Sequence, residues 1–88
     1  MQVLQQNGFK RAYKKLHPAQ KQAVNKALVA VCENPKLGEQ KKGDLAGIFV
    51  YKFSRDTQLY LLAYTFDPAT LTLIVLGTHE NFYQELKR

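Results

Sequence analysis

Three apolar runs with the character of β-strands occupy the segment 47–83, and two short polar segments separate them. The first connection is 54–57. The second is 67–70, in which Asp67 and Pro68 take the first two positions favoured in a type I turn. Connections this short make neighbouring strands antiparallel, because a parallel return needs a crossover of a dozen or more residues. The pattern therefore predicts a three-stranded antiparallel meander.

Both phases of the second and third runs are largely apolar, which a sheet with one solvent-exposed face would not show. In the middle run, one phase is Leu59, Leu61 and Ala63, and the other is Tyr60, Leu62, Tyr64 and Phe66. In the last run, Leu71, Leu73 and Val75 alternate with Ile74 and Leu76. We therefore expect both faces of the sheet to be covered, one by helices of this chain and the other by a partner.

Two amphipathic helices are predicted before the meander. The first apolar stripe, at spacings of i, i+3, i+4 and i+7, consists of Phe9, Ala12, Tyr13 and Leu16. The second has the same spacing and consists of Val24, Ala27, Leu28, Val31 and Cys32. Asn7 is placed as the N-cap of the first helix, Pro18 as the first residue of the second, and Asn34 with Pro35 as its end. The segment 1–6 allows a short strand at most.

The predicted fold is α+β. A small antiparallel sheet, made of the short N-terminal strand and the meander, packs against an N-terminal helical hairpin, and a short helix ends the chain. With 88 residues, the chain forms a single domain, 1–88. Its hydrophobic content of 45% and charged content of 23% are ordinary for a globular domain and exclude a disordered chain.

The charge balance is strongly basic. Thirteen Lys and Arg against seven Asp and Glu give a formal net charge of +6, which favours a polyanion or an acidic protein as partner. No apolar run approaches the roughly 20 residues that span a bilayer, so we expect a cytoplasmic protein with no membrane partner. A single cysteine excludes an internal disulfide and favours a core thiol.

Three short motifs punctuate the order of elements. Asn34-Pro35-x-x-Gly38 follows the helical pair, Leu45-x-Gly47 leads into the meander, and Gly77-Thr78-His79 ends it, with the aromatic Tyr83 four residues after His79. In this order the motifs resemble the RelE/ParE superfamily of bacterial toxins from type II toxin–antitoxin systems. The ending is similar to the YafQ-like branch of messenger-RNA endonucleases. The resemblance covers nearly the whole chain.

The resemblance implies a small ribonuclease, without metal or cofactor, that cleaves messenger RNA in the ribosomal A site. It also implies a cognate antitoxin, which we expect to be acidic or amphipathic. In the implied reaction a ribose 2′-OH attacks the adjacent phosphate and leaves a 2′,3′-cyclic phosphate and a 5′-OH. This chemistry needs a base for the 2′-OH, an acid for the leaving oxygen, and cations near the developing charge.

His79 is the candidate acid or base, because an unperturbed imidazole titrates near pH 6.5. Its spacing to Phe82, Tyr83 and Leu86 is helical, which alone favours a structural role, whereas the resemblance favours catalysis. Tyr83 matches the family's aromatic position, where a ring stacks on a base or a hydroxyl contacts the phosphate. An ordinary core aromatic is the alternative for Tyr83.

Three further charged residues are catalytic candidates through the resemblance. Lys52 interrupts an apolar strand at a position where the family carries a basic residue or His, although a strand Lys is usually at a solvated face or edge. Arg55 is a phosphate ligand candidate in the adjacent turn, and Asp56 resembles an acidic position of the YafQ-like branch. Most charges in turns are merely solvated.

A second set of basic residues is a candidate surface for RNA phosphates of the ribosome and messenger, with a solvated surface as the alternative. The set is Lys10, Arg11, Lys14, Lys15, Lys41 and Lys42.

Two other functions remain open at this level. A ParE-like toxin would bind DNA gyrase without chemistry of its own, and an inactive module would bind only an antitoxin or RNA. His79 with Tyr83 favours the endonuclease, because inhibition of gyrase requires no acid–base pair.

Overall fold

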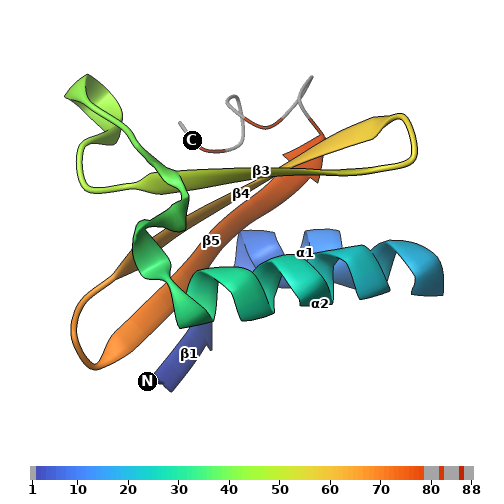
Figure 1. The fold of residues 1–88 in the computed structure, drawn as a ribbon, viewed down its shortest axis with the longest axis horizontal. Helices are drawn as coiled ribbons and strands as arrows, with labels where there is room; N and C mark the ends of the chain where they lie inside the picture. Colours follow the sequence, from blue (N-terminus) through green and yellow to red (C-terminus); the bar gives the residue numbers. More distant parts are fainter. Residues whose placement is uncertain (1, 79–81, 83–85, 87–88) are drawn as a thin grey trace.

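The structure of the chain is a computed structural model that describes residues 2–78, 82 and 86. Within these residues, two helices lie against one face of a five-stranded mixed sheet (Figure 1). The elements are β1 (Gln2–Gln5), α1 (Asn7–Lys14), α2 (Pro18–Glu33), β2 (Glu39–Gln40), β3 (Phe49–Arg55), β4 (Gln58–Phe66) and β5 (Thr70–Thr78), with two 3₁₀ turns at Pro35–Leu37 and Gly43–Leu45. The strand order is β1-β5-β4-β3-β2. The predicted α+β class with a helical hairpin on the sheet is confirmed.

The meander of β3, β4 and β5 is antiparallel, as predicted. The first turn is tighter than expected, because Arg55 still pairs with Gln58 and only two residues connect the strands. The first of them, Asp56, has a φ of +56°, in the left-handed region. In the second turn, the Asp67 carboxylate accepts hydrogen bonds from the backbone N–H groups of Ala69 and Thr70, each at 2.8 Å.

The edges of the sheet differ from the expected all-antiparallel arrangement. β1 pairs with β5 in parallel, from Gln2 opposite Thr70 to Gln5 opposite Leu73. Both helices and three strands separate β1 from β5 in the chain, so no short turn constrains their relative direction. β2, which the sequence pattern did not predict, adds to the other edge and pairs antiparallel with the start of β3.

The helix boundaries follow the predicted signals closely. Asn7 is the first residue of α1 and not its N-cap, because Gln6 takes the capping position without a side-chain hydrogen bond. Pro18 begins α2, as predicted, and the His17 backbone N–H donates to Gln20 Oε1 at 2.8 Å. At the other end, the Asn34 N–H donates to the Ala30 carbonyl, and Pro35 prevents continuation.

The main core lies between the helices and the sheet. Its buried members are Phe9, Val24, Val31, Leu62, Tyr64, Leu71, Leu73 and Leu76. Both predicted apolar stripes of the helices contribute to it, since Ala12, Tyr13, Leu16 and Leu28 also pack against this cluster. Cys32 is half-buried, so the predicted core thiol keeps some contact with solvent.

A β-bulge in β5 makes part of the predicted alternation wrong, because Val75 does not share a face with Leu71 and Leu73. Ala63 pairs with Val75, but its neighbour Tyr64 pairs with Leu73, so Ile74 is the extra residue. Beyond it the phase of the strand is inverted: Val75 points away from the helices, and Leu76 joins the helix-side core.

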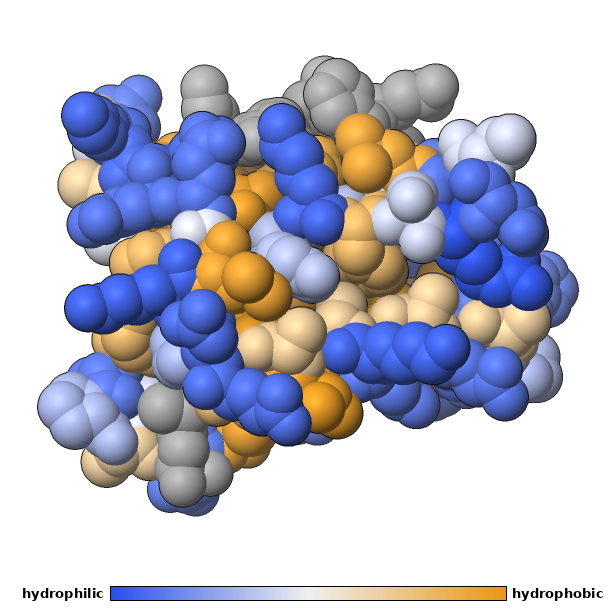
Figure 2. Space-filling model, in the orientation of Figure 1, coloured by the Kyte–Doolittle hydropathy of each residue, from blue (hydrophilic) through white to orange (hydrophobic). Residues whose placement is uncertain are grey.

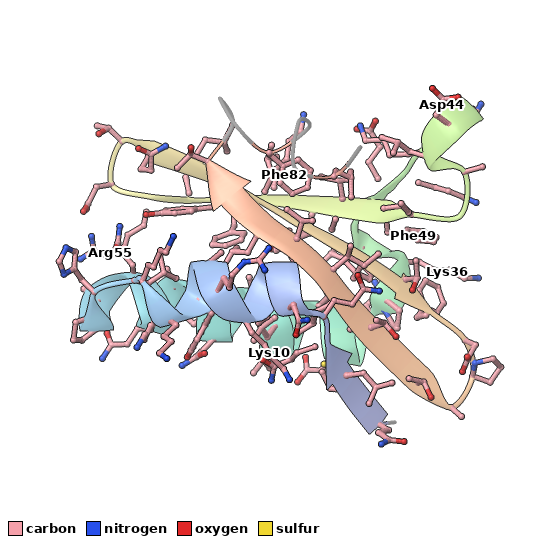
Figure 3. All side chains as sticks on the ribbon, turned by 180° about the vertical axis from the view of Figure 1, so that it is seen from behind. Lys10, Lys36, Asp44, Phe49, Arg55 and Phe82 are labelled. Carbon is pink, nitrogen blue, oxygen red and sulfur yellow. The ribbon has the colours of Figure 1, made fainter. Side chains whose placement is uncertain are left out.

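Residues of this chain contribute to the cover of the second face of the sheet. The sequence analysis expected a partner to provide that cover, so this expectation is corrected. Phe82 is 1% exposed and packs against a cluster formed by Val50, Leu61, Ala63 and Val75. Leu86 packs on the same cluster, and Phe82 lies across the sheet from the helices (Figure 3). Both residues are helical, in agreement with the predicted C-terminal helix at these two positions.

Among the described residues, no helix combines the length and apolar character that crossing a membrane requires.

Candidate functional site

Lys52 lies on the face of the sheet that Phe82 covers. It pairs with Leu61, and Leu61 pairs with Gly77, so one row across three strands joins Lys52 to the end of β5. Cross-strand neighbours share a face, and Leu61 belongs to the cluster around Phe82. The Lys52 side chain is exposed at the rim of this cluster. The structure therefore places a cation, Lys52, in the same cross-strand row as Gly77 near the end of β5.

β2 adds an acid to the same face. Glu39 pairs with Val50, two residues before Lys52, so the side chains of all three share one side of the sheet. Lys41 Nζ donates to Glu39 Oε1 at 2.9 Å. This hydrogen bond lowers the pKa of Glu39, with a smaller electrostatic contribution from Lys52. Glu39 is thus an ionised carboxylate between two lysines.

A buried tyrosine fixes the segment that carries β2. The Tyr64 hydroxyl donates to the Pro35 carbonyl at 2.6 Å and accepts from the Gly38 N–H at 2.9 Å. Burial raises the pKa of Tyr64, so the hydroxyl stays protonated and keeps donating. A Cβ on Gly38 would lie 2.7 Å from the Tyr64 hydroxyl oxygen, closer than packing allows. The motif Asn34-Pro35-x-x-Gly38 is therefore the clamp that holds β2 beside β3.

Arg55 lies on the opposite side of the sheet from Lys52. It lines a groove beside α2 together with Tyr51 and Phe53, which are also odd-numbered residues of β3, and Figure 3 shows it on the helical side. Its guanidinium forms an exposed ion pair with Asp56 at 2.9 Å. Arg55 and Asp56 therefore meet each other but are not brought together with Lys52, and their catalytic roles remain predictions.

The groove beside α2 has a volume of about 320 Å³. It is lined by Ala19, Gln22, Ala23, Lys26 and Ala27 of α2 and by Tyr51, Phe53, Ser54 and Arg55 of β3. The view from the side of α2 shows apolar surface exposed between hydrophilic side chains (Figure 2). The sequence pattern did not predict this groove, because it depends on how α2 crosses β3.

The two residues with the strongest catalytic expectation, His79 and Tyr83, lie outside the described residues. Thr78, which ends β5, and Phe82 bracket His79 in the chain, and Phe82 is buried against the second face.

The predicted RNA-binding residues form two groups. Lys10, Arg11, Lys14 and Lys15 are all exposed on or directly after α1. Lys42 is exposed as well, whereas Lys41 is half-buried and bonded to Glu39. In the part of the chain that the structure describes, no three His, Cys, Asp or Glu side chains converge as metal ligands would.

Known structures share this fold. One chain of the E. coli RelBE toxin–antitoxin complex superposes with a TM-score of 0.68 at 19% identity, over 86% of this chain and 93% of that one. The Mycobacterium tuberculosis RelBE2 toxin–antitoxin complex gives 0.71 at 24% identity, over 89% and 96%. A YoeB/ParE toxin from Agrobacterium tumefaciens gives 0.69 at 17% identity, over 90% and 99%. Comparison with curated proteins gave no significant match.

Sequence comparison with family models reaches the same group of proteins independently. The model of the ParE-like toxin of type II bacterial toxin–antitoxin systems matches residues 3–87, nearly the whole chain. The match does not single out the YafQ-like branch. This chain belongs to the ParE-like toxin family of type II bacterial toxin–antitoxin systems.

Proposed function

We propose that this toxin is a ribosome-dependent endonuclease that cleaves messenger RNA without a metal. The observation that carries the proposal is the arrangement on the second face of the sheet. β2 and β3 place Glu39 and Lys52 there, and Lys52 belongs to the row that ends in Gly77, two residues before His79 in the sequence. Cleavage through a 2′-OH requires a base, an acid and a cation, and a carboxylate, an imidazole and a lysine can fill these roles.

Each residue has a defined role in the proposed reaction. The ionised Glu39 accepts the proton of the 2′-OH, and the oxygen attacks the adjacent phosphorus. Lys52 balances the negative charge that develops on the phosphate oxygens. The bond to the 5′-oxygen breaks, and His79 donates the proton that this oxygen needs. The products are a 2′,3′-cyclic phosphate and a 5′-OH, and Tyr83 supports a neighbouring base by stacking.

Two partners complete the proposal. The exposed basic residues of α1, which include Lys10 (Figure 3), bind phosphates of the ribosome. A cognate antitoxin binds the toxin, as it does in the two complexes of similar fold. The net charge of +6 favours an acidic antitoxin segment.

The test compares two identical substitutions, His79→Gln and His17→Gln. His17 is exposed at the N-cap of α2, and its backbone N–H donates a hydrogen bond to Gln20 Oε1. A glutamine at this position supplies the same backbone N–H. Loss of a proton-transfer group typically lowers the rate by about 10²–10⁴-fold. We therefore expect His79→Gln to lose cleavage of ribosome-bound messenger RNA, and His17→Gln to retain it, with both proteins folded.

The melting temperature is measured on the same samples as cleavage. A His79→Gln protein that is less stable but fully active would show that His79 is structural, and the catalytic proposal would fail. Arrest of DNA replication before translation in cells that express the wild-type toxin would indicate gyrase as the target instead.

A further inference from the structure

The groove between α2 and β3 lies on the opposite side of the sheet from Glu39 and Lys52. Tyr51 and Phe53 form its floor, and both are half-buried, so part of each ring is accessible from the groove. The two rings are nearly parallel, with an interplanar angle of 21° and centroids 6.0 Å apart. Phe53 also stacks on the buried Tyr60 at 5.5 Å. The floor is therefore an aromatic surface held in place by the core.

The wall formed by α2 leaves room for a flat ligand. Its residues include three alanines, at 19, 23 and 27, whose small side chains leave space above the rings. The resulting volume of about 320 Å³ lies in the range of small-ligand sites. Gln22 is exposed on the same wall, and among the described residues its side-chain amide has no hydrogen-bond partner. An amide next to aromatic rings can bind the edge of a nucleobase whose face covers the rings.

Two cations lie at different points along the groove. Gln20 Nε2 donates to the Tyr60 hydroxyl, and Tyr60 pairs with Phe53, so the start of α2 lies beside the end of β3. Arg55, two residues after Phe53 on the same side of the strand, is therefore near the start of α2 (Figure 3). Lys26 lies six residues after Gln20, about 9 Å farther along the helix axis. The two cations thus approach the aromatic floor from different ends.

Both cations can take an additional anionic partner. Lys26 is exposed, and no carboxylate among the described residues pairs with it. Arg55 pairs with Asp56, but its side chain keeps 40% exposure, and a guanidinium has five N–H donors to share. An exposed ion pair of this kind is weak, so a phosphate can share Arg55 with Asp56. None of the described residues that line the groove is acidic, so its charge favours an anion at both ends.

We propose that this groove binds an unpaired nucleotide of a single-stranded RNA. Its base covers Tyr51 and Phe53, and the phosphates before and after it contact Lys26 and Arg55. Cations at both ends of an aromatic surface match a chain that has a phosphate on each side of every base, whereas a free mononucleotide carries phosphate on one side only. Because the groove and Lys52 lie on opposite faces of the sheet, the nucleotide bound here is not the one cleaved. The inference rests on RNA as the target in the proposed function, and not on the cleavage chemistry.

The test measures binding of the full-length chain to a short fluorescein-labelled oligoadenylate by fluorescence anisotropy. Every 2′-OH of this probe is methylated, so it cannot be cleaved. Ala23→Leu fills the groove, keeps every charge and introduces another good helix former. Stacking of one base typically contributes a factor of about 5–150 to binding, so this variant should bind the probe about fivefold more weakly or worse. Ala30→Leu makes the same change on α2 outside the groove, and it should bind like the wild type.

A second probe separates stacking from charge. An oligonucleotide of the same length without bases keeps the phosphates and loses the stacking. We expect it to bind the wild type about fivefold more weakly or worse than the oligoadenylate does. It should also bind the wild type and Ala23→Leu equally, because neither protein can stack a base that is absent.

A pair of surface variants tests the phosphate contacts and keeps the proposal testable if Ala23→Leu does not fold. Lys26→Gln removes one contact, so the slope of the logarithm of the binding constant against the logarithm of the salt concentration should become shallower by about 0.7. Lys36→Gln makes the same change at an exposed site at the other end of the molecule (Figure 3), and it should leave the slope nearly unchanged.

Three results would overturn the assignment. The first is a folded Ala23→Leu protein that binds the oligoadenylate like the wild type. The second is adenosine monophosphate binding as tightly as the oligoadenylate, which would assign the groove to a free nucleotide. The third is a Glu-rich peptide that loses binding to Ala23→Leu while the oligoadenylate does not, which would assign the groove to a protein partner. Cleavage of messenger RNA is not measured here, so this test and that of the proposed function fail independently.

Discussion

Replacing Tyr64 with Phe removes one oxygen atom from a fully buried side chain and tests the clamp on β2 directly. The hydroxyl makes two hydrogen bonds, one with the buried Gly38 N–H and one with the half-buried Pro35 carbonyl. A buried donor left without a partner costs about 1–3 kcal/mol, whereas a carbonyl that water reaches costs less, about 0.5–1.5 kcal/mol. We therefore expect Tyr64→Phe to lower the free energy of unfolding by about 2–3 kcal/mol.

The measurement is urea and thermal unfolding of the isolated chain. For a domain of this size, 1 kcal/mol corresponds to about 4–8 °C, so the melting temperature should fall by about 10–20 °C. Tyr60→Phe is the matched control. Its hydroxyl accepts one partly buried hydrogen bond from Gln20 Nε2 at 2.8 Å, and we expect a loss of about 0.5–1 kcal/mol. Equal losses for the two substitutions would refute the clamp.

A double-mutant cycle separates the clamp from general packing. Gly38→Ala places a methyl group 2.7 Å from the Tyr64 oxygen, so it should be strongly destabilising in the wild-type chain. In the Tyr64→Phe background that oxygen is absent, and the same substitution should cost less. Strict additivity of the two substitutions would show that Gly38 and Tyr64 act independently.

Two further predictions concern pH and salt. The pKa of Tyr64 is raised in the folded state from an ordinary value of 10.0, so its contribution to stability is complete below pH 10 and is lost as pH rises through the folded pKa. The free energy of unfolding should therefore fall more steeply above pH 10 for the wild type than for Tyr64→Phe. Parallel pH dependences of the two proteins would contradict the assignment. Lys10 and Lys14 are both exposed, so the double substitution Lys10→Glu with Lys14→Glu should leave the fold intact and weaken ribosome binding. The slope of the logarithm of the binding constant against the logarithm of the salt concentration should become shallower by about 1.4–1.8. Unchanged binding would mean that this face of α1 is merely solvated.

The sequence pattern was sufficient for the helices and the meander because their signals are local. The stripe from Phe9 to Leu16 and the turn at Asp67 each specify structure within a few residues, and both are confirmed. The bulge at Ile74 is different, because it arises from the register between two strands. Both phases of β5 are apolar, so an inverted alternation leaves no trace in the sequence.

The pairing of the two edge strands could not be predicted from local sequence signals, for a related reason. β1 is only four residues long, and its direction depends on β5, which lies far along the chain. β2 is two residues long and polar on both sides, so the segment 36–46 is indistinguishable from a connection. Such strands exist because tertiary neighbours hold them in place.

The candidate site shows the same division between local and distant causes. Lys52 stands out in the sequence because it interrupts an apolar strand, and the structure places it in one cross-strand row with Leu61 and Gly77. Glu39, in contrast, has no distinguishing feature in the sequence, and only the structure shows that it lies on the same face as Lys52. Its position depends on Tyr64, a residue of another strand, which holds the chain between Pro35 and Gly38 so that β2 meets Val50. The motif Asn34-Pro35-x-x-Gly38, which suggested the family likeness in the sequence, thus supports the carboxylate of Glu39 in the structure, a residue that the sequence analysis did not identify.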